Sequence, residues 1–194
     1  MARIPYADPA TLSEPTRRAL DAVPPLNVFR LLAVADAAFP AFLRFTGGLW
    51  NDAELSPRRR ELVILHVARL TGAEYEWHQH VAVAQLCEIS AEEIAAIRAG
   101  RVDGEPFGAD DRVLFALTEV VVRRERAGDE LLAAARRVLT DRELVEAHLV
   151  VAMYAGLAAL MTNLDLDLDE QLGAELLVSR DGAPQLGERL APDA

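Results

Sequence analysis

Two consecutive segments with strong helical signals constrain the fold of this chain more than any other feature. The first covers residues 57–71: Ser56 can cap a helix, Pro57 suits a first helical turn, and Gly72 is a good helix stop. The second covers residues 74–86. Together they hold three of the four histidines of the chain. We therefore expect two successive helices that carry most of the reactive side chains.

Helical signals continue along the rest of the chain, and no strand pattern of convincing length appears. A segment at residues 41–45 is expected to end at Gly47 and Gly48. The last segment contains an apolar run at residues 149–161, well short of the roughly 20 residues that a membrane span needs, so we interpret it as a buried helix of a soluble protein. The predicted fold class is all α. Capping residues, helix stops and apolar spacing predict the other helices at about residues 16–23, 27–39, 91–99, 110–128, 130–139 and 141–163.

The length and composition fit a single domain. The chain has 194 residues, of which 52% are hydrophobic, enough for one substantial core. We expect an N-terminal arm with a short helix at residues 1–30, a helical domain at residues 31–165, and an acidic C-terminal tail at residues 166–194. The tail alternates leucine with aspartate and then becomes rich in glycine and proline, which predicts an ordered acidic turn, a short helix and a loose end.

The charge of the chain narrows the classes of partner. A formal net charge of -11 disfavours nucleic acid and anionic membranes, whose phosphates require clustered arginine and lysine. The N-terminus lacks the apolar core of a signal peptide, and a single cysteine suits a reducing compartment. We expect a cytoplasmic protein whose partners are a small-molecule substrate and further copies of itself.

A glutamate and a histidine in the second helix are spaced to form an acid/base pair. Glu76 and His80 are four residues apart, so they lie about 40° apart around the helix axis. His78 lies about 200° from Glu76 and points elsewhere. A pair of this kind also occurs on helices as a solvated or capping pair. The spacing alone leaves both interpretations open.

A longer pattern around this pair resembles a known family. Glu61, eleven residues, Ala73, two residues, Glu76, three residues and His80 follow the signature of the carboxymuconolactone decarboxylase and alkylhydroperoxidase D-like family. In that family's peroxidases the positions of Ala73 and Glu76 are the cysteines of a Cys-x-x-Cys pair. Both cysteines are absent here.

The resemblance implies an alkylhydroperoxidase D-like helical bundle that forms oligomers, either trimers or hexamers, with dimers as an alternative. The decarboxylase branch of the family also places a glutamate four residues before a histidine and uses neither metal nor cofactor. We therefore expect cofactor-independent acid/base chemistry of a lyase, isomerase or hydrolase type on a small organic acid or lactone. The expected catalytic residues are Glu76 and His80 as acid and base, with Glu61 orienting His80. The expected substrate-binding residues are Tyr75, Trp77, His66 and Tyr154.

One departure separates this chain from the decarboxylases themselves. The resemblance requires a histidine four residues before the tyrosine of a Tyr-Ala-Gly segment, and here that position is Val150, before Tyr154. The nearest histidine, His148, lies about 240° around the helix from Tyr154. Arg69 is also the only cation within the central stretch that can pair with a substrate carboxylate. The resemblance therefore indicates the fold more firmly than the substrate.

Three other interpretations remain open. A thiol peroxidase is disfavoured because Cys87, the only cysteine, lies about 10 Å along the helix axis from His80. A metal site would use Glu76, His80 and His66, with His78 as a further candidate ligand. A non-catalytic helical oligomer with a vestigial site is the third possibility.

Aromatic residues are dense in the N-terminal third of the chain. They can roof a ligand pocket, although such residues more often serve as core or as subunit contact. The group consists of Phe29, Phe39, Phe42, Phe45 and Trp50.

Overall fold

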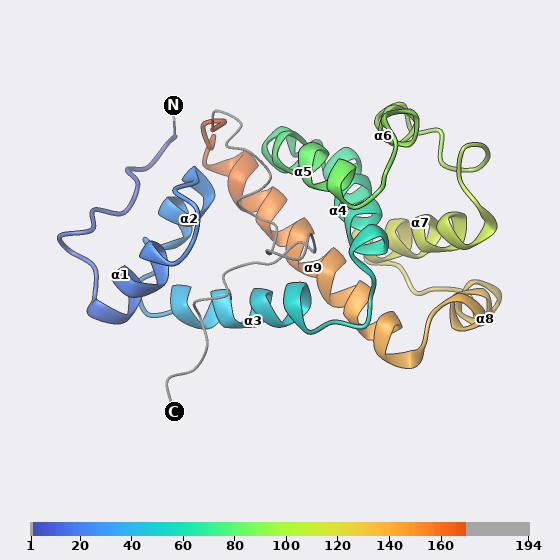
Figure 1. Cartoon of the computed structure of the whole chain (residues 1–194), viewed down its shortest axis with the longest axis horizontal. Coiled ribbons are helices and arrows are strands. Elements are labelled where there is room, and N and C mark those ends of the chain that lie inside the picture. The colour runs from blue at the N-terminus through green and yellow to red at the C-terminus, as the bar shows by residue number, and fades with distance from the viewer. Residues whose placement is uncertain (1, 170–194) are drawn as a thin grey trace.

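The structure, a computed structural model, describes residues 2–169 and is built from helices alone over that range (Figure 1). The prediction of an all-α fold is confirmed. The predicted short helix and loose end of the C-terminal tail fall at residues 170–194, outside the described range. The helices are α1 (Glu14–Asp21), α2 (Asn27–Leu32), α3 (Phe39–Asn51), α4 (Pro57–Thr71), α5 (Glu74–Leu86), α6 (Ala91–Arg98), α7 (Ala109–Val122), α8 (Asp129–Val138) and α9 (Asp141–Asn163).

Helix α4 is the centre of the structure. It packs against α5, α7 and α9, and it also contacts α6. Every residue from Arg60 to Ala68 is buried. A helix that is buried all round has no solvent-facing stripe, so its few polar side chains must find partners inside the protein. These buried polar residues of α4 are Arg60, Glu61 and His66.

The helix ends follow from local chemistry that the sequence already displays. Gly72 ends α4 with a backbone φ of 69°, in the left-handed region that glycine adopts without strain. Ser90 and Glu93 form a reciprocal capping box at the start of α6, and Thr140 and Glu143 form another at the start of α9. These boundaries agree with the sequence-based prediction.

Helix α3 is longer than its sequence suggests. The predicted segment at residues 41–45 was expected to end at Gly47 and Gly48, but the helix continues through both glycines to Asn51. Each glycine costs about 1 kcal/mol of helix propensity. Leu49 and Trp50 lie beyond the glycines and are both buried, so their packing offsets that cost. The expected end of this helix was therefore wrong.

Two other expected boundaries also differ. Helix α2 begins at Asn27 as expected but stops at Leu32 instead of continuing to residue 39. Helix α7 stops at Val122, where Arg124 adopts a φ of 58°, instead of continuing to Gly128. A non-glycine residue in the left-handed region cannot continue a right-handed helix. Neither ending had a glycine or proline signal at the position where it occurs.

Helix α9 joins the core although its composition is very apolar. By length and hydropathy it is the one helix among the described residues that could cross a membrane. It packs along α4 and α7, however, and it buries Val150, Val151, Tyr154 and Ala158. We describe it as a core helix of this bundle.

The segment after α9 fastens the N-terminal arm and α2 to the rest of the structure. Arg3 pairs with Asp165 at 3.0 Å, and the Tyr6 hydroxyl donates to Asp167 at 3.1 Å. The backbone N–H of Asn27 donates to Asp169 at 3.0 Å. The alternating aspartates at residues 165–169 therefore form an ordered acidic turn, as the sequence indicates, and they hold α2 beside the end of α9 (Figure 1).

Candidate active site

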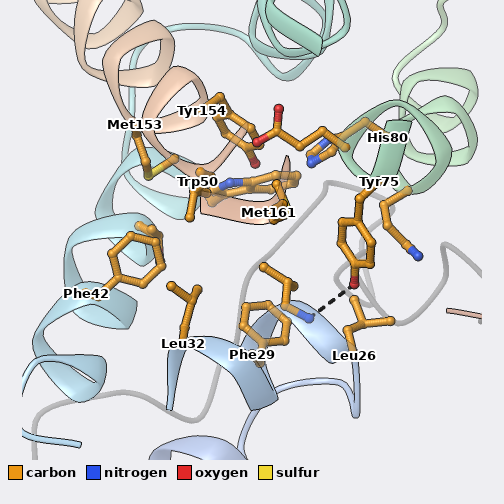
Figure 2. Close-up of a pocket in the computed structure, with 15 residues that line it drawn as sticks. Leu26, Phe29, Leu32, Phe42, Trp50, Tyr75, His80, Met153, Tyr154 and Met161 are labelled. Carbon is orange, nitrogen blue, oxygen red and sulfur yellow. Dashed lines mark hydrogen bonds between the residues drawn. The ribbon is translucent and has the colours of Figure 1, made fainter. Parts of the chain in front are cut away.

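A cavity of about 80 Å³ lies between α2, α3, α5 and α9. Its walls are mainly apolar and aromatic. Figure 2 shows Trp50, His80 and Tyr154 gathered at one end of it, with Phe29 and Leu32 of α2 across the open space. The residues that line the cavity are Leu26, Val28, Phe29, Leu32, Phe42, Thr46, Trp50, Tyr75, Glu76, Gln79, His80, Met153, Tyr154, Leu157 and Met161.

Helix α5 supplies the polar wall of the cavity. Tyr75, Glu76, Gln79 and His80 all line it. At about 100° of rotation per residue these four positions fall within a sector of about 140° on one side of the helix. Local helix geometry therefore explains why these four side chains share the cavity.

His80 is oriented by a glutamate from the central helix. Its Nδ1 lies 2.8 Å from Oε2 of Glu61, which is completely buried, while His80 is 8% exposed. Because the Glu61 carboxylate accepts a hydrogen bond, Nδ1 carries the proton and Nε2 keeps its lone pair. The ring of Tyr154 meets His80 edge-on at 5.1 Å, and Trp50 lies 6.0 Å away. The ring of His80 is thus held on three sides.

Glu76 lies in the same cavity wall but has a different environment. It is 2% exposed, and neither carboxyl oxygen has a hydrogen-bond partner among the described residues. Burial raises the pKa of Glu76 to about 9. At neutral pH the group is therefore a neutral carboxylic acid that can donate a proton. The hydrogen-bond partner of His80 is Glu61, whereas Glu76 lines the same cavity without a hydrogen bond to His80.

A buried arginine supports the cavity wall from behind. Arg60 is 1% exposed, and its guanidinium lies 4.3 Å from the centre of the Trp50 ring. It donates to the backbone carbonyls of Leu49 and Trp50, both at 3.2 Å. Arg60 thereby fixes the end of α3 and the Trp50 indole. Sequence reasoning missed it, because Arg60 is one of three consecutive arginines and nothing local distinguishes it from the other two.

The two tyrosines predicted to bind substrate both line the cavity. The Tyr75 hydroxyl accepts a hydrogen bond from the backbone N–H of Val28 at 3.3 Å and donates to Asp169, so it ties α2 to α5. Burial raises the pKa of Tyr154, and the nearby charge of Glu61 raises it further. Tyr154 therefore stays a neutral phenol.

Trp77 and His66, also predicted to bind substrate, lie outside the cavity. Trp77 is about 100° around α5 from Glu76 and stacks under the Arg98 guanidinium at 4.8 Å. His66 is about 140° around α4 from Glu61, and this rotation turns it towards Phe115 of α7, with ring centres 4.9 Å apart. The expectation for these two residues does not match the structure.

The remaining titratable candidates are also elsewhere. His78 and His148 do not line the cavity, and His148 Nδ1 bonds to the carbonyl of Leu144 in its own helix at 2.7 Å. Cys87 is buried, and burial, reinforced by the charge of Glu61, raises the pKa of its thiol to about 12. Within residues 2–169 no group of three or more histidine, cysteine, aspartate or glutamate residues could hold a metal ion. The proposed metal set containing Glu76 is therefore not assembled.

The aromatic group of the N-terminal third divides between cavity and scaffold. Phe29, Phe42 and Trp50 line the cavity, Phe39 lies in the core, and Phe45 is exposed. Phe42 and Trp50 lie eight residues apart on α3, close to two full helical turns, so they share one face. This spacing was a usable sequence signal once α3 was known to continue to Asn51. Gln79 was missed because glutamine in a helix is commonly a surface residue.

The sequence of the central region matches a described family. Residues 36–119 match the profile of the Carboxymuconolactone decarboxylase family. This range contains Trp50, Glu61, Glu76 and His80, whereas Tyr154 on α9 lies beyond it. No protein among the curated sequences matches the chain.

Solved structures with a similar helical arrangement include proteins from three bacteria. An uncharacterized peroxidase-related protein from Ralstonia eutropha, with an alkylhydroperoxidase AhpD core, gives a TM-score of 0.75 at 18% identity, covering 87% of this chain and 93% of that chain. An uncharacterized peroxidase-related protein from a Silicibacter species gives 0.74 at 17% identity, covering 87% and 92%. A protein of unknown function from Agrobacterium tumefaciens, a candidate AhpD antioxidant defence protein, gives 0.64 at 17% identity, covering 72% and 96%.

Identities this low show a shared fold and leave the activity open. The family profile covers α4 and α5, the helices that supply Glu61, Glu76 and His80. Residues 36–119 of this chain are thus similar to the carboxymuconolactone decarboxylase family, and its helices adopt the AhpD-like fold.

Proposed function

We propose that the cavity beside His80 is the active site of a cofactor-independent enzyme that moves a proton on a small organic acid, a lactone or a related carbonyl compound. The observation that carries this proposal is the separation of roles between two carboxyl groups at one histidine. Glu61 holds the His80 ring, while Glu76 is buried and protonated in the same cavity. Acid and base of separated pKa in one pocket are the requirement for this chemistry.

The proposed reaction begins at the carbon next to a carbonyl group. His80 Nε2 takes a proton from that carbon, the C–H electron pair forms a C=C bond, and the carbonyl oxygen becomes an enolate that Glu76 protonates or hydrogen-bonds. Where the substrate carries a C=C bond next to that carbon, the product is a dienolate, and return of a proton to its far carbon shifts the C=C bond and completes an isomerisation. Departure of a group from the neighbouring carbon, with its bonding electron pair, completes an elimination instead. Glu61 stabilises the imidazolium that His80 becomes.

The thiol peroxidase alternative has less support. Ala73 and Glu76 occupy the positions of the two peroxidase cysteines in the resemblance. Cys87, the only cysteine, does not line the cavity, and burial raises its thiol pKa to about 12, so little thiolate exists at neutral pH. A peroxide in the cavity therefore meets no cysteine thiolate.

Hydrogen–deuterium exchange tests the proposal without knowledge of the natural substrate. Cyclopentanone and γ-butyrolactone are incubated with the protein in D₂O, and loss of the α-proton signal is followed by NMR. We expect exchange above the buffer rate, its loss in His80→Ala, and its retention in His148→Ala. The second variant is a matched control because His148 lies outside the cavity. Equal exchange rates in both variants, or no exchange with the native protein, would instead support a non-catalytic scaffold.

We also propose that the protein assembles from identical subunits. Val145 is 58% exposed and Leu149 is 39% exposed, and they lie four residues apart on one face of α9. Such an apolar face is a suitable contact for a second copy of the chain. Light scattering at micromolar concentration should give a dimer, trimer or hexamer, and a particle of 21.2 kDa would contradict this.

A further inference from the structure

Three buried polar atoms in the cavity wall have no partner among the described residues. They are the two carboxyl oxygens of Glu76 and the side-chain nitrogen of Gln79. A buried polar group without a hydrogen bond costs about 1–3 kcal/mol, and such groups are rare in native structures. Glu76 and Gln79 are two neighbouring side chains with such groups, and both line the cavity. This indicates a place where a ligand supplies the missing hydrogen-bond partners.

The two side chains are positioned to reach the same ligand atom. Glu76 and Gln79 are three residues apart on α5, so they are neighbours about 60° apart on the same side of the helix. The protonated carboxyl of Glu76 offers one O–H donor, and the amide of Gln79 offers N–H donors. His80, the next residue after Gln79, lies on the other side of Glu76 within the same sector. Two donors and one proton acceptor therefore face one cavity.

We propose that Glu76 and Gln79 together bind the carbonyl oxygen of the substrate, with Gln79 as a substrate-positioning residue, and that this substrate is an uncharged ketone, ester or lactone. This inference rests on the proposed function and narrows its substrate class. The reacting carbonyl belongs to an uncharged ketone, ester or lactone, and a free carboxylate is excluded at that position. As His80 removes the neighbouring proton, negative charge develops on the bound oxygen. Donors already aimed at that atom stabilise the charge without rearrangement.

The charges around the cavity select an uncharged ligand. No arginine or lysine is among the lining residues. Arg60, the buried cation behind Trp50, is not a lining residue, and it donates to the carbonyls of Leu49 and Trp50. A carboxylate placed beside His80 would be buried near Glu61 without a paired cation, which costs several kcal/mol. An uncharged carbonyl oxygen needs only the two donors.

Binding of three small probes tests the inference. Cyclopentanone carries the oxygen, methylenecyclopentane has nearly the same shape without it, and cyclopentanecarboxylate carries a charge. Affinities are measured by NMR titration at pH 7 for the native protein, Gln79→Met and Gln79→Ala. The first variant keeps the side-chain length, and the second serves if the first fails to fold. Gln85→Met is the matched control, since Gln85 is an exposed glutamine of the same helix.

We expect cyclopentanone to bind more tightly than cyclopentanecarboxylate. Each Gln79 variant should lower the affinity for cyclopentanone about fivefold to tenfold, which is the usual effect of one lost neutral hydrogen bond. The affinity for methylenecyclopentane should stay unchanged. Gln85→Met should change neither the affinity for cyclopentanone nor the affinity for methylenecyclopentane. Infrared spectra of ¹³C-carbonyl-labelled cyclopentanone should show a C=O stretch lowered by binding, and the lowering should be smaller in Gln79→Met.

Three results would overturn the inference: tighter binding of the carboxylate, no binding of cyclopentanone, or an unchanged ratio of ketone to hydrocarbon affinity in both Gln79 variants. Failure of the proposed function looks different. If cyclopentanone binds with a lowered C=O stretch but its α-protons do not exchange, the oxygen site stands and the enzyme proposal fails. If exchange occurs and is unaffected in the Gln79 variants, the enzyme proposal stands and the oxygen site fails.

Discussion

Among the described residues, buried His66 and His80 each contact a glutamate, and His80 is the one that lines the cavity of the candidate site. His80 pairs with Glu61 at 2.8 Å, and His66 lies 3.3 Å from Glu119. Helix α4 contributes to both pairs, Glu61 to the first and His66 to the second. His66 is completely enclosed and packs against the tilted ring of Phe115, whereas His80 lines the cavity. The pairs are chemically alike, but their access to a ligand differs.

The electrostatic consequences differ as well. Burial, together with the charge of Arg69, lowers the pKa of His66 to about 4, and Glu119 only partly opposes this effect. His66 is therefore a neutral packed side chain at physiological pH. The cavity beside His80 instead holds Glu76, whose pKa burial raises to about 9. A histidine–glutamate contact becomes a candidate site only where a second titratable group and an open volume adjoin it.

The largest difference should appear in proton-transfer rate. His80→Ala should lower the exchange of cyclopentanone α-protons by about 10² to 10⁴, the usual loss when a general base is removed. His66→Gln should leave the rate within about twofold, because His66 is outside the cavity. NMR exchange rates of the two folded variants make the comparison. A similar loss in both variants would show that the cavity does not distinguish the two histidines.

The next largest effect concerns Glu76 and the pH dependence of stability. Its folded pKa of about 9 exceeds its usual 4.5, so the native state binds the extra proton between these values. The contribution of Glu76 to stability is fully present below pH 4.5 and is lost as pH rises towards 9, by about 1.4 kcal/mol per unit. Glu76→Gln should remove this dependence. Urea unfolding from pH 5 to 9 measures it, and a pH-independent difference between the two proteins would contradict the burial of Glu76.

His66 should show the opposite sign over a narrower range. Its folded pKa of about 4 is below its usual 6.5, so the unfolded chain binds the extra proton between these values. The contribution of His66 to the free energy of unfolding is therefore fully present above pH 6.5 and is lost as pH falls towards 4. His66→Gln should flatten the unfolding free energy between pH 4 and 6.5 and should leave the alkaline range unchanged. If the variant is flatter above pH 7 instead, the buried, neutral state of His66 is wrong.

The smallest expected effect belongs to Cys87, a buried titratable group that lies outside the cavity, as His66 does. Burial raises the pKa of its thiol to about 12, so Cys87→Ser should leave α-proton exchange unchanged. The native protein should also show no thiol-dependent consumption of hydrogen peroxide or an organic hydroperoxide in an assay with dithiothreitol. A robust peroxidase rate that Cys87→Ser abolishes would establish one-cysteine redox chemistry in place of the proposed reaction.

The amino-acid sequence by itself determined the helices that carry the site. Gly72 and the capping boxes at Ser90 and Thr140 set helix boundaries through contacts within a few residues. The positions of Glu76 and His80 on one side of α5 follow from the same local geometry. These features were predictable because each depends only on neighbours along the chain.

Only the tertiary structure decided which groups meet. The partner of His80 is Glu61, nineteen residues earlier, because α4 packs against α5. His66 lies on the face of α4 that packs against α7, where it contacts Phe115. Helix α3 continues through two glycines because Trp50 beyond them is buried. The neutral state of Glu76 likewise required α2, α3 and α9 to close around it. Burial, and with it the pKa of each group, is a property of the packed helices and cannot be read from any one of them.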